Sequence, residues 1–89
     1  MYRVVLECSD VPPLEGAEAA TDIESEFREH RPHHQNVKCT FESGRLVLVA
    51  ENNFDADGRA LMDEFSDCIS AYIATPFDGD LRLVSSKVI

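Results

Sequence analysis

Two hydrophobic periodicities alternate along this chain, and their order constrains the fold more than any other feature. Residues 2–8 follow a period of two, with Tyr2, Val4, Leu6 and Cys8 on one face and Arg3, Val5 and Glu7 on the other. Alternation with β-branched and aromatic residues is typical of a strand that is buried on one side. The segment therefore predicts a β-strand at the start of the chain.

Residues 14–30 change to a helical period. Ala20, Ile23, Phe27 and His30 recur at spacings of three and four, which places them on one stripe of an α-helix. Basic residues gather towards the end of this segment, where they complement the helix dipole, and Pro32 then prevents the helix from continuing. We expect a helix that buries this stripe.

A β-hairpin is predicted over residues 37–51. Val37, Cys39 and Phe41 alternate with polar residues, a Ser43-Gly44 turn follows, and residues 45–51 alternate again. A two-residue loop fixes the register, because it sets which residues face each other across the strands. The expected pairs are Glu42 with Arg45, Phe41 with Leu46, and Cys39 with Leu48.

The last third of the chain predicts a second helix and a final strand. The helix is expected from Asp55, as its cap, to about Ala74, with Leu61, Phe65, Cys68 and Tyr72 as its buried stripe. Pro76 ends it, and residues 81–88 read as a strand.

The predicted order is thus strand, helix, strand, strand, helix, strand, within a single domain over residues 1–89. A split βαβ order with one hairpin is typical of the ferredoxin-like plait (βαββαβ), an α+β fold. In that fold both helices cover one face of a four-stranded antiparallel sheet. The handedness of crossover connections leaves few alternatives.

Charge and composition exclude several classes of partner. Seventeen acidic residues oppose eight basic ones, for a formal net charge of −9, which disfavours nucleic acid as a partner. No run of about 18 apolar residues predicts a membrane span, and the charged N-terminal segment does not resemble a secretory signal. We expect a soluble, cytoplasmic protein with no cofactor and with its three cysteines buried and reduced.

The sheet face without helices is the first candidate for function. If Val4 and Leu6 face the helices, then Val5, Val47, Val49 and Val84 lie on the open face. Valine on a solvated sheet can simply reflect β-propensity. A cluster on the central strands can instead bury against a second copy, a protein partner or an apolar ligand. We predict self-association through this face.

Residues 53–64 resemble the calcium loop of an EF-hand. Oxygen-bearing side chains occur at loop positions one, three and five (Asn53, Asp55 and Asp57), with Gly58 at six and Glu64 at twelve. The loop departs from the pattern in having Asn53 at position one and Ala60 at position eight, and a strand rather than a helix is expected before it. The alternative is that these residues cap and decorate the second helix.

All three histidines, His30, His33 and His34, lie within five residues of one another and could form a transition-metal site. Pro32 separates His30 from the pair, and adjacent residues in an extended segment point apart. The alternative interpretation is that His30 packs at the helix end while His33 and His34 are solvated.

No catalytic motif is present. Cys8 followed by Asp10 at a strand end offers a possible nucleophile, and it is the weakest hypothesis. The residues favour a non-catalytic binding or regulatory module that self-associates through its open sheet face. The alternatives are a metal-binding domain, at residues 53–64 or at the histidines, and a small enzyme that uses Cys8 and Asp10.

Overall fold

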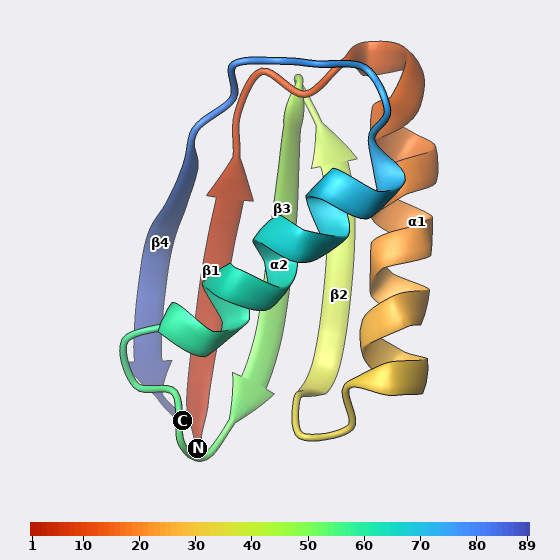
Figure 1. The fold of residues 1–89 in the computed structure, drawn as a ribbon. Helices are drawn as coiled ribbons and strands as arrows, with labels where there is room; N and C mark the ends of the chain where they lie inside the picture. Colours follow the sequence, from red (N-terminus) through yellow and green to blue (C-terminus); the bar gives the residue numbers. More distant parts are fainter.

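The computed structural model describes all residues from Met1 to Ile89. Its elements follow the order predicted from the two periodicities (Figure 1). They are β1 (Tyr2–Cys8), α1 (Pro13–His30), β2 (Gln35–Glu42), β3 (Arg45–Asn52), α2 (Arg59–Tyr72) and β4 (Leu81–Val88).

The four strands form one antiparallel sheet with the order β2-β3-β1-β4. In this order β1 and β3 are the central strands, and β2 and β4 are the edges. Both helices cover the same face of the sheet (Figure 1). This arrangement is the ferredoxin-like plait, and it confirms the predicted fold class. Neither helix combines the length and the apolar character that a membrane span requires.

The β2–β3 hairpin has the predicted register. Glu42 faces Arg45, Phe41 faces Leu46, and Cys39 faces Leu48. The turn residues Ser43 and Gly44 have φ angles of 51° and 77°. Positive φ at both central positions is the conformation of a type I′ turn, whose twist matches that of the paired strands.

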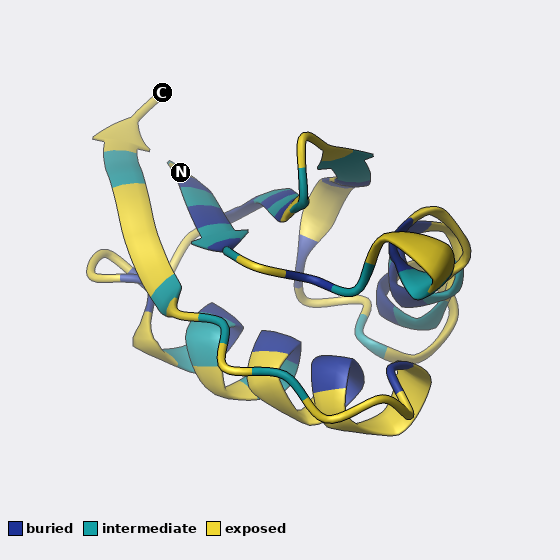
Figure 2. Cartoon of the chain, turned by 90° about the horizontal axis from the view of Figure 1, so that it is seen from above, coloured by how far each residue is buried: buried dark blue, intermediate teal, exposed yellow.

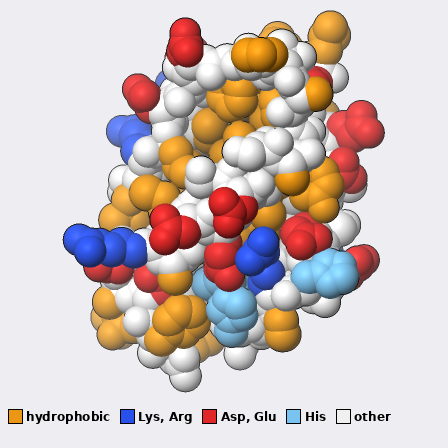
Figure 3. All heavy atoms as spheres, in the orientation of Figure 1, with side chains coloured by type: hydrophobic (Ala, Val, Ile, Leu, Met, Phe, Trp, Pro, Cys, Tyr) orange, Lys and Arg blue, Asp and Glu red, His pale blue; other side chains and the backbone are white.

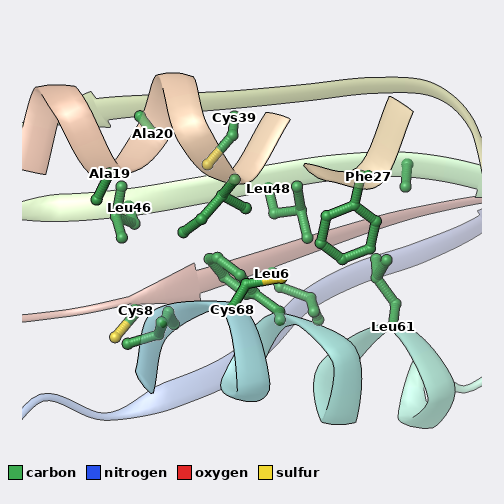
Figure 4. Packing of buried hydrophobic residues seen from close by; sticks show 14 of the residues in the cluster. Leu6, Cys8, Ala19, Ala20, Phe27, Cys39, Leu46, Leu48, Leu61 and Cys68 are labelled. Atoms are coloured by element: carbon green, nitrogen blue, oxygen red, sulfur yellow. The ribbon is translucent and has the colours of Figure 1, made fainter. Parts of the chain in front are cut away.

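The core lies between the sheet and the two helices. Figure 4 shows Phe27 projecting from α1 and Leu61 from α2 into the layer formed by Leu6 and Leu48 of the central strands. The buried side of α2 faces the sheet, while β4 is largely exposed (Figure 2). Each central strand thus buries one face completely, as the alternation predicted.

Two residues that were expected in the buried stripes lie on the surface. His30 is exposed in the last turn of α1, where its ring lies beside Glu26 and Glu29 of the same helix. Tyr72 is also exposed, and its hydroxyl donates to Glu26 Oε2 on α1 at 3.4 Å. The buried stripe of α1 therefore ends at Phe27, whereas that of α2 continues through Ile69 to Ile73, which follows the last helical residue.

The second helix begins at Arg59, four residues after the predicted cap. Residues 55–58 form a turn in which Gly58 donates its backbone N–H to the carbonyl of Asp55, with Gly58 at a φ of 74°. Asp55 still performs the capping chemistry, because its carboxylate accepts the N–H groups of Ala60 and Leu61 at 3.1 and 3.0 Å. The predicted carboxylate does bind the start of α2, but the N-cap position is Gly58 rather than Asp55.

Candidate functional site

Two histidines and a glutamate meet where the α1–β2 connection packs against α2. His33 Nε2 lies 3.0 Å from Glu64 Oε1, and His34 Nε2 is hydrogen-bonded to Glu64 Oε2. Arg31 Nη1 donates to Glu64 Oε1 at 3.2 Å. Histidine, carboxylate and guanidinium side chains lie together on the helix-covered side of the molecule (Figure 3). We call His33, His34 and Glu64, with Arg31, the histidine cluster.

The end of α1 explains why two consecutive histidines reach the same carboxylate. The N–H of Arg31 still bonds to the carbonyl of Phe27, and the N–H of His34 returns to the carbonyl of Arg31 at 3.2 Å. The intervening residues form a turn rather than an extended segment, so consecutive side chains are not forced apart. The ring centroids of His33 and His34 are only 4.4 Å apart.

His34 is the buried member of the pair. Its side chain is 0% exposed, against 47% for His33. The rings of Phe27 and Phe54 lie nearby, with centroids at 5.7 and 5.9 Å from that of His34. The prediction that His33 is solvated was correct, and the same prediction for His34 was wrong.

Asn52 at the end of β3 fixes the protonation pattern of His34. Asn52 Oδ1 accepts the backbone N–H groups of Phe54 and Asp55 at 3.2 and 2.8 Å, so this end of the amide is the oxygen. The other end, Nδ2, is a donor and lies 3.3 Å from His34 Nδ1. A ring nitrogen that accepts a hydrogen bond carries no proton. His34 is therefore held as the Nε2–H tautomer, which donates to Glu64.

The cluster keeps Glu64 ionised. Burial alone would raise the pKa of the carboxyl, but the hydrogen bonds from His34 and His33 oppose this effect, and the pKa of Glu64 lies below its ordinary value of 4.5. Arg31 adds a cation within hydrogen-bonding distance. The charged carboxylate thus ties the end of α1 to α2.

The ligand atoms of His33, His34 and Glu64 all lie within 4.8 Å of one another, a spacing that suits a metal ion. A metal on His34 Nε2 requires the proton on Nδ1, where a carboxylate or carbonyl normally accepts it. Asn52 presents a donor at that position instead. The second shell is therefore the wrong one for a ligating His34, although the first shell has the right residue types.

The third predicted histidine does not join the cluster. His30 Nε2 lies 3.9 Å from Glu26 and 3.7 Å from Glu29, on the exposed side of α1. Glu64 replaces it, and no sequence signal connected Glu64 with His34, since 30 residues separate the two.

The EF-hand-like residues do not converge. Asn53 is exposed, Asp55 is committed to the N-terminus of α2, and Asp57 pairs with Arg59 at 3.2 Å. Glu64 belongs to the histidine cluster, and β3 precedes the segment where an EF-hand has a helix. The alternative interpretation, in which these residues cap and decorate the second helix, accounts for Asp55 and Asp57.

The cysteine environments oppose thiolate formation. Cys8 is buried, and burial together with the nearby charges of Asp80 and Asp10 raises the pKa of its thiol. Burial raises the pKa of Cys39 to about 12. A nucleophilic cysteine needs a lowered pKa, so Asp10 has the wrong sign of charge for activating Cys8. The structure contains no pocket beside either residue.

The open sheet face is the second candidate site. Val5 and Val49 are direct cross-strand partners on the two central strands, and Val47 lies two residues further along β3. All three side chains are partly exposed, and no helix covers them. Val84 is 48% exposed and occupies a register irregularity opposite Val5 and Leu6, so it stands at the margin of the face.

The polar residues around these valines are unusually basic for this chain. Five of its eight basic residues and three of its 17 acidic residues lie in register on the open face. The basic residues are Arg3, Lys38, Arg45, Arg82 and Lys87, and the acidic ones are Glu7, Glu42 and Glu51. Arg3 bonds to Glu51 at 3.0 Å, and Glu7 lies between Arg45 and Arg82. The face is apolar at its centre and positive at its rim.

Comparison with known proteins gave no relative: no protein family and no curated protein matched the chain. The residues and their geometry therefore carry the functional argument.

Proposed function

We propose that this chain is a non-catalytic binding module that self-associates through its open sheet face. The observation that supports this proposal is the direct pairing of Val5 with Val49 at the centre of that face. With Val47 they form a short apolar strip on β1 and β3. These two central strands are flanked on both sides by other strands of the sheet.

A second copy suits this strip because a two-fold axis through the face brings the same valines together from both chains. The rim residues carry both signs of charge, so lysine and arginine of one copy can meet the glutamates of the other. Burial of the valines from both copies removes apolar surface from water at about 25 cal/mol per Å². The dimer is expected to be weak, because the strip is small.

Analytical ultracentrifugation from about 10 to 500 µM tests the proposal, since this range covers weak to moderate dimers. We expect the weight-average mass to rise with concentration in the wild type and to stay at the monomer value in Val49→Glu. Leu14→Glu is the matched control, because Leu14 is 98% exposed at the start of α1, away from the sheet face. A wild type that remains monomeric throughout would overturn the proposal.

Zinc binding by the histidine cluster is the second candidate function, and the convergence of three ligand atoms within 4.8 Å favours it. It ranks second because Asn52 donates to His34 where a ligating histidine needs an acceptor. The Asn52→Asp variant keeps the two backbone hydrogen bonds and supplies that acceptor.

Zinc titration, followed by calorimetry and by melting temperature, distinguishes a zinc-binding cluster from one that does not bind zinc. We expect no heat and no change in melting temperature for the wild type, and measurable zinc binding in Asn52→Asp, because second-shell partners change metal affinity by about 10- to 100-fold. Wild-type binding that is lost in His33→Ala would establish the zinc function instead.

A further inference from the structure

The outer edge of β4 is the most exposed apolar segment of the chain. No strand pairs with that edge, and α2 makes few contacts with β4. Leu83, Val84 and Val88 are 40%, 48% and 79% exposed. The other edge strand, β2, is different, because α1 packs along it and its exposed residues are polar (Figure 1).

An exposed strand edge presents unpaired backbone N–H and C=O groups, which can accept another strand. The register irregularity at Val84 divides β4 into two short regular stretches. Such an irregularity increases local twist and disfavours long, flat pairing. The edge therefore suits a short segment better than a long strand.

The charge of the edge indicates which kind of segment fits. β4 contains Arg82 and Lys87 and no acidic residue. Arg3 of β1 faces Lys87 in the register, but Glu51 already pairs with Arg3 and Glu7 pairs with Arg82, so Lys87 is the cation of this edge that has no acidic partner. The net charge of the whole chain is −9, so this edge is a local exception. At physiological ionic strength charges are screened beyond about 8 Å. The charges near this edge, rather than the net charge of the chain, therefore determine which segment it attracts.

A second copy of β4 is a poor occupant for the same reason. Antiparallel pairing of two β4 strands places two Arg82 and two Lys87 side chains on one ribbon in every register, with no acidic partner on either strand. Like charges across a strand pair are destabilising.

We propose that the β4 edge binds a short, extended, acidic segment of a partner protein, which adds to the sheet as a fifth strand. The backbone of the segment bonds to β4. Its acidic side chains lie beside Arg82 and Lys87 on the open-face side, and its apolar side chains contact Leu83 and Val88 on the helix side. This contact uses the backbone edge of β4, whereas self-association uses the valine strip on β1 and β3, although Arg82 and Lys87 also belong to the rim of the open face.

The test uses a synthetic octapeptide of alternating glutamate and valine, added up to about 1 mM to the full chain, the weak limit of specific binding. Amide NMR signals report where it binds. We expect saturable shifts that are largest in β4 and in the facing residues of β1, with little change in β2. The chain is kept at a concentration where ultracentrifugation shows monomer, so that failure of self-association does not affect the result.

Three controls make the outcome decisive. A peptide with an N-methyl group on every residue keeps its side-chain charge but has no backbone N–H to donate from either edge, so it cannot form a strand ladder and should not bind. An octapeptide of lysine and valine should not bind either. Lys87→Glu should weaken binding about tenfold, since it replaces an exposed attraction by a repulsion. Lys38→Glu is the matched control, because Lys38 is the only other lysine and lies on β2, the opposite edge.

Binding of the N-methylated peptide with equal affinity would overturn strand addition. Equal binding of the lysine peptide would overturn the acidic specificity, as would equal effects of Lys87→Glu and Lys38→Glu. Absence of shifts at the highest peptide concentration would overturn the proposal as a whole.

Discussion

The side-chain amide of Asn52 has its two ends in different environments, and this asymmetry sets the chemistry of the histidine cluster. The oxygen holds the N–H groups of Phe54 and Asp55, and the nitrogen faces His34. A buried polar group that lacks a hydrogen-bond partner costs free energy. The hydrogen bonds of Asn52 to His34 and to the two backbone N–H groups therefore hold the amide and the imidazole ring in one orientation. His34 is consequently a neutral donor to Glu64 rather than a free base.

The tautomer of His34 gives a prediction at this scale. In Asn52→Asp the residue facing His34 Nδ1 becomes an acceptor, and Glu64 still accepts from Nε2. Both ring nitrogens should then carry protons at neutral pH. Nitrogen-15 NMR of labelled histidine should show one protonated and one bare nitrogen for His34 in the wild type, and two protonated nitrogens in the variant. Identical spectra would show that Asn52 does not control the ring.

A second prediction concerns pH and Glu64. Its pKa in the folded chain lies below the ordinary value of 4.5, because the hydrogen bonds from His34 and His33 oppose the effect of burial. A lowered folded-state pKa contributes stability that is complete above the unfolded pKa and is lost as pH falls through the folded value. The wild type should therefore lose its advantage over Glu64→Gln as pH falls below 4.5.

Urea unfolding of both proteins between about pH 7 and pH 3 measures this difference, over the range in which carboxyl groups titrate. Glu51 also has a lowered pKa, owing to its hydrogen bonds with Asn36 and Arg3, but both proteins retain it. Its contribution cancels in the comparison. A difference in unfolding free energy that is constant with pH would contradict the role assigned to Glu64.

Sequence reasoning located the histidines but not their arrangement. The turn after Arg31 and the position of Glu64 on α2 depend on how two elements pack, which no local pattern records. By contrast, the burial of Cys39 and the exposure of His33 follow from the chain's local alternation and its turn residues, and both were predicted. Residues whose surroundings are local are thus predictable, and residues that meet across elements are not.

At the scale of elements, the hairpin was predicted from Lys38 onward and α2 only in part. The Ser43-Gly44 turn sets the register of the pairs near it, but an irregularity between Gln35 and Lys38, where Asn36 has a φ of 50°, shifts the pairing at the far end. For α2 the capping carboxylate of Asp55 was recognised, but Gly58 adopts a positive φ that delays the first helical residue. Helix starts depend on the turn before them, which is why their boundaries are harder to predict than their presence.

The packing of α1 on β2 gives a prediction about Gly16. A Cβ atom added there would lie 2.3 to 2.5 Å from ring atoms of Phe41, so the glycine allows this close approach. Alanine favours a helix over glycine by about 1 kcal/mol, but overpacking costs about 1–3 kcal/mol. We expect Gly16→Ala to lower the free energy of unfolding by about 1 kcal/mol, as measured by urea unfolding.

The control for this prediction shrinks the facing side chain. Gly16→Ala combined with Phe41→Leu should be less destabilised than the two single effects added together, because the added methyl group then has room. If Gly16→Ala stabilised the chain by its helix propensity alone, the contact with Phe41 would not constrain α1.

At the scale of the whole molecule, the charges are divided between the two faces. Five of eight basic residues lie on the open sheet face, which leaves three basic and fourteen acidic residues for the rest of the chain. Each of the three, Arg28, Arg31 and Arg59, is already paired with an acid. The remaining surface is therefore strongly negative, and its self-repulsion opposes folding.

This repulsion predicts that salt stabilises the chain. Raising the KCl concentration from about 20 to 500 mM shortens the Debye length from about 20 to 4 Å and should raise the melting temperature.

Glu18→Lys should stabilise the chain by about 0.5 kcal/mol at low salt, because Glu18 is exposed on α1 with Glu15 and Asp22 one turn away on either side. Lys38→Glu should destabilise it by a similar amount, since it adds to the negative charge. The two variants should converge on the wild type as salt increases. A melting temperature that falls with KCl would show that the ion pairs of the open face, such as Arg3 with Glu51, outweigh the repulsion of the other face.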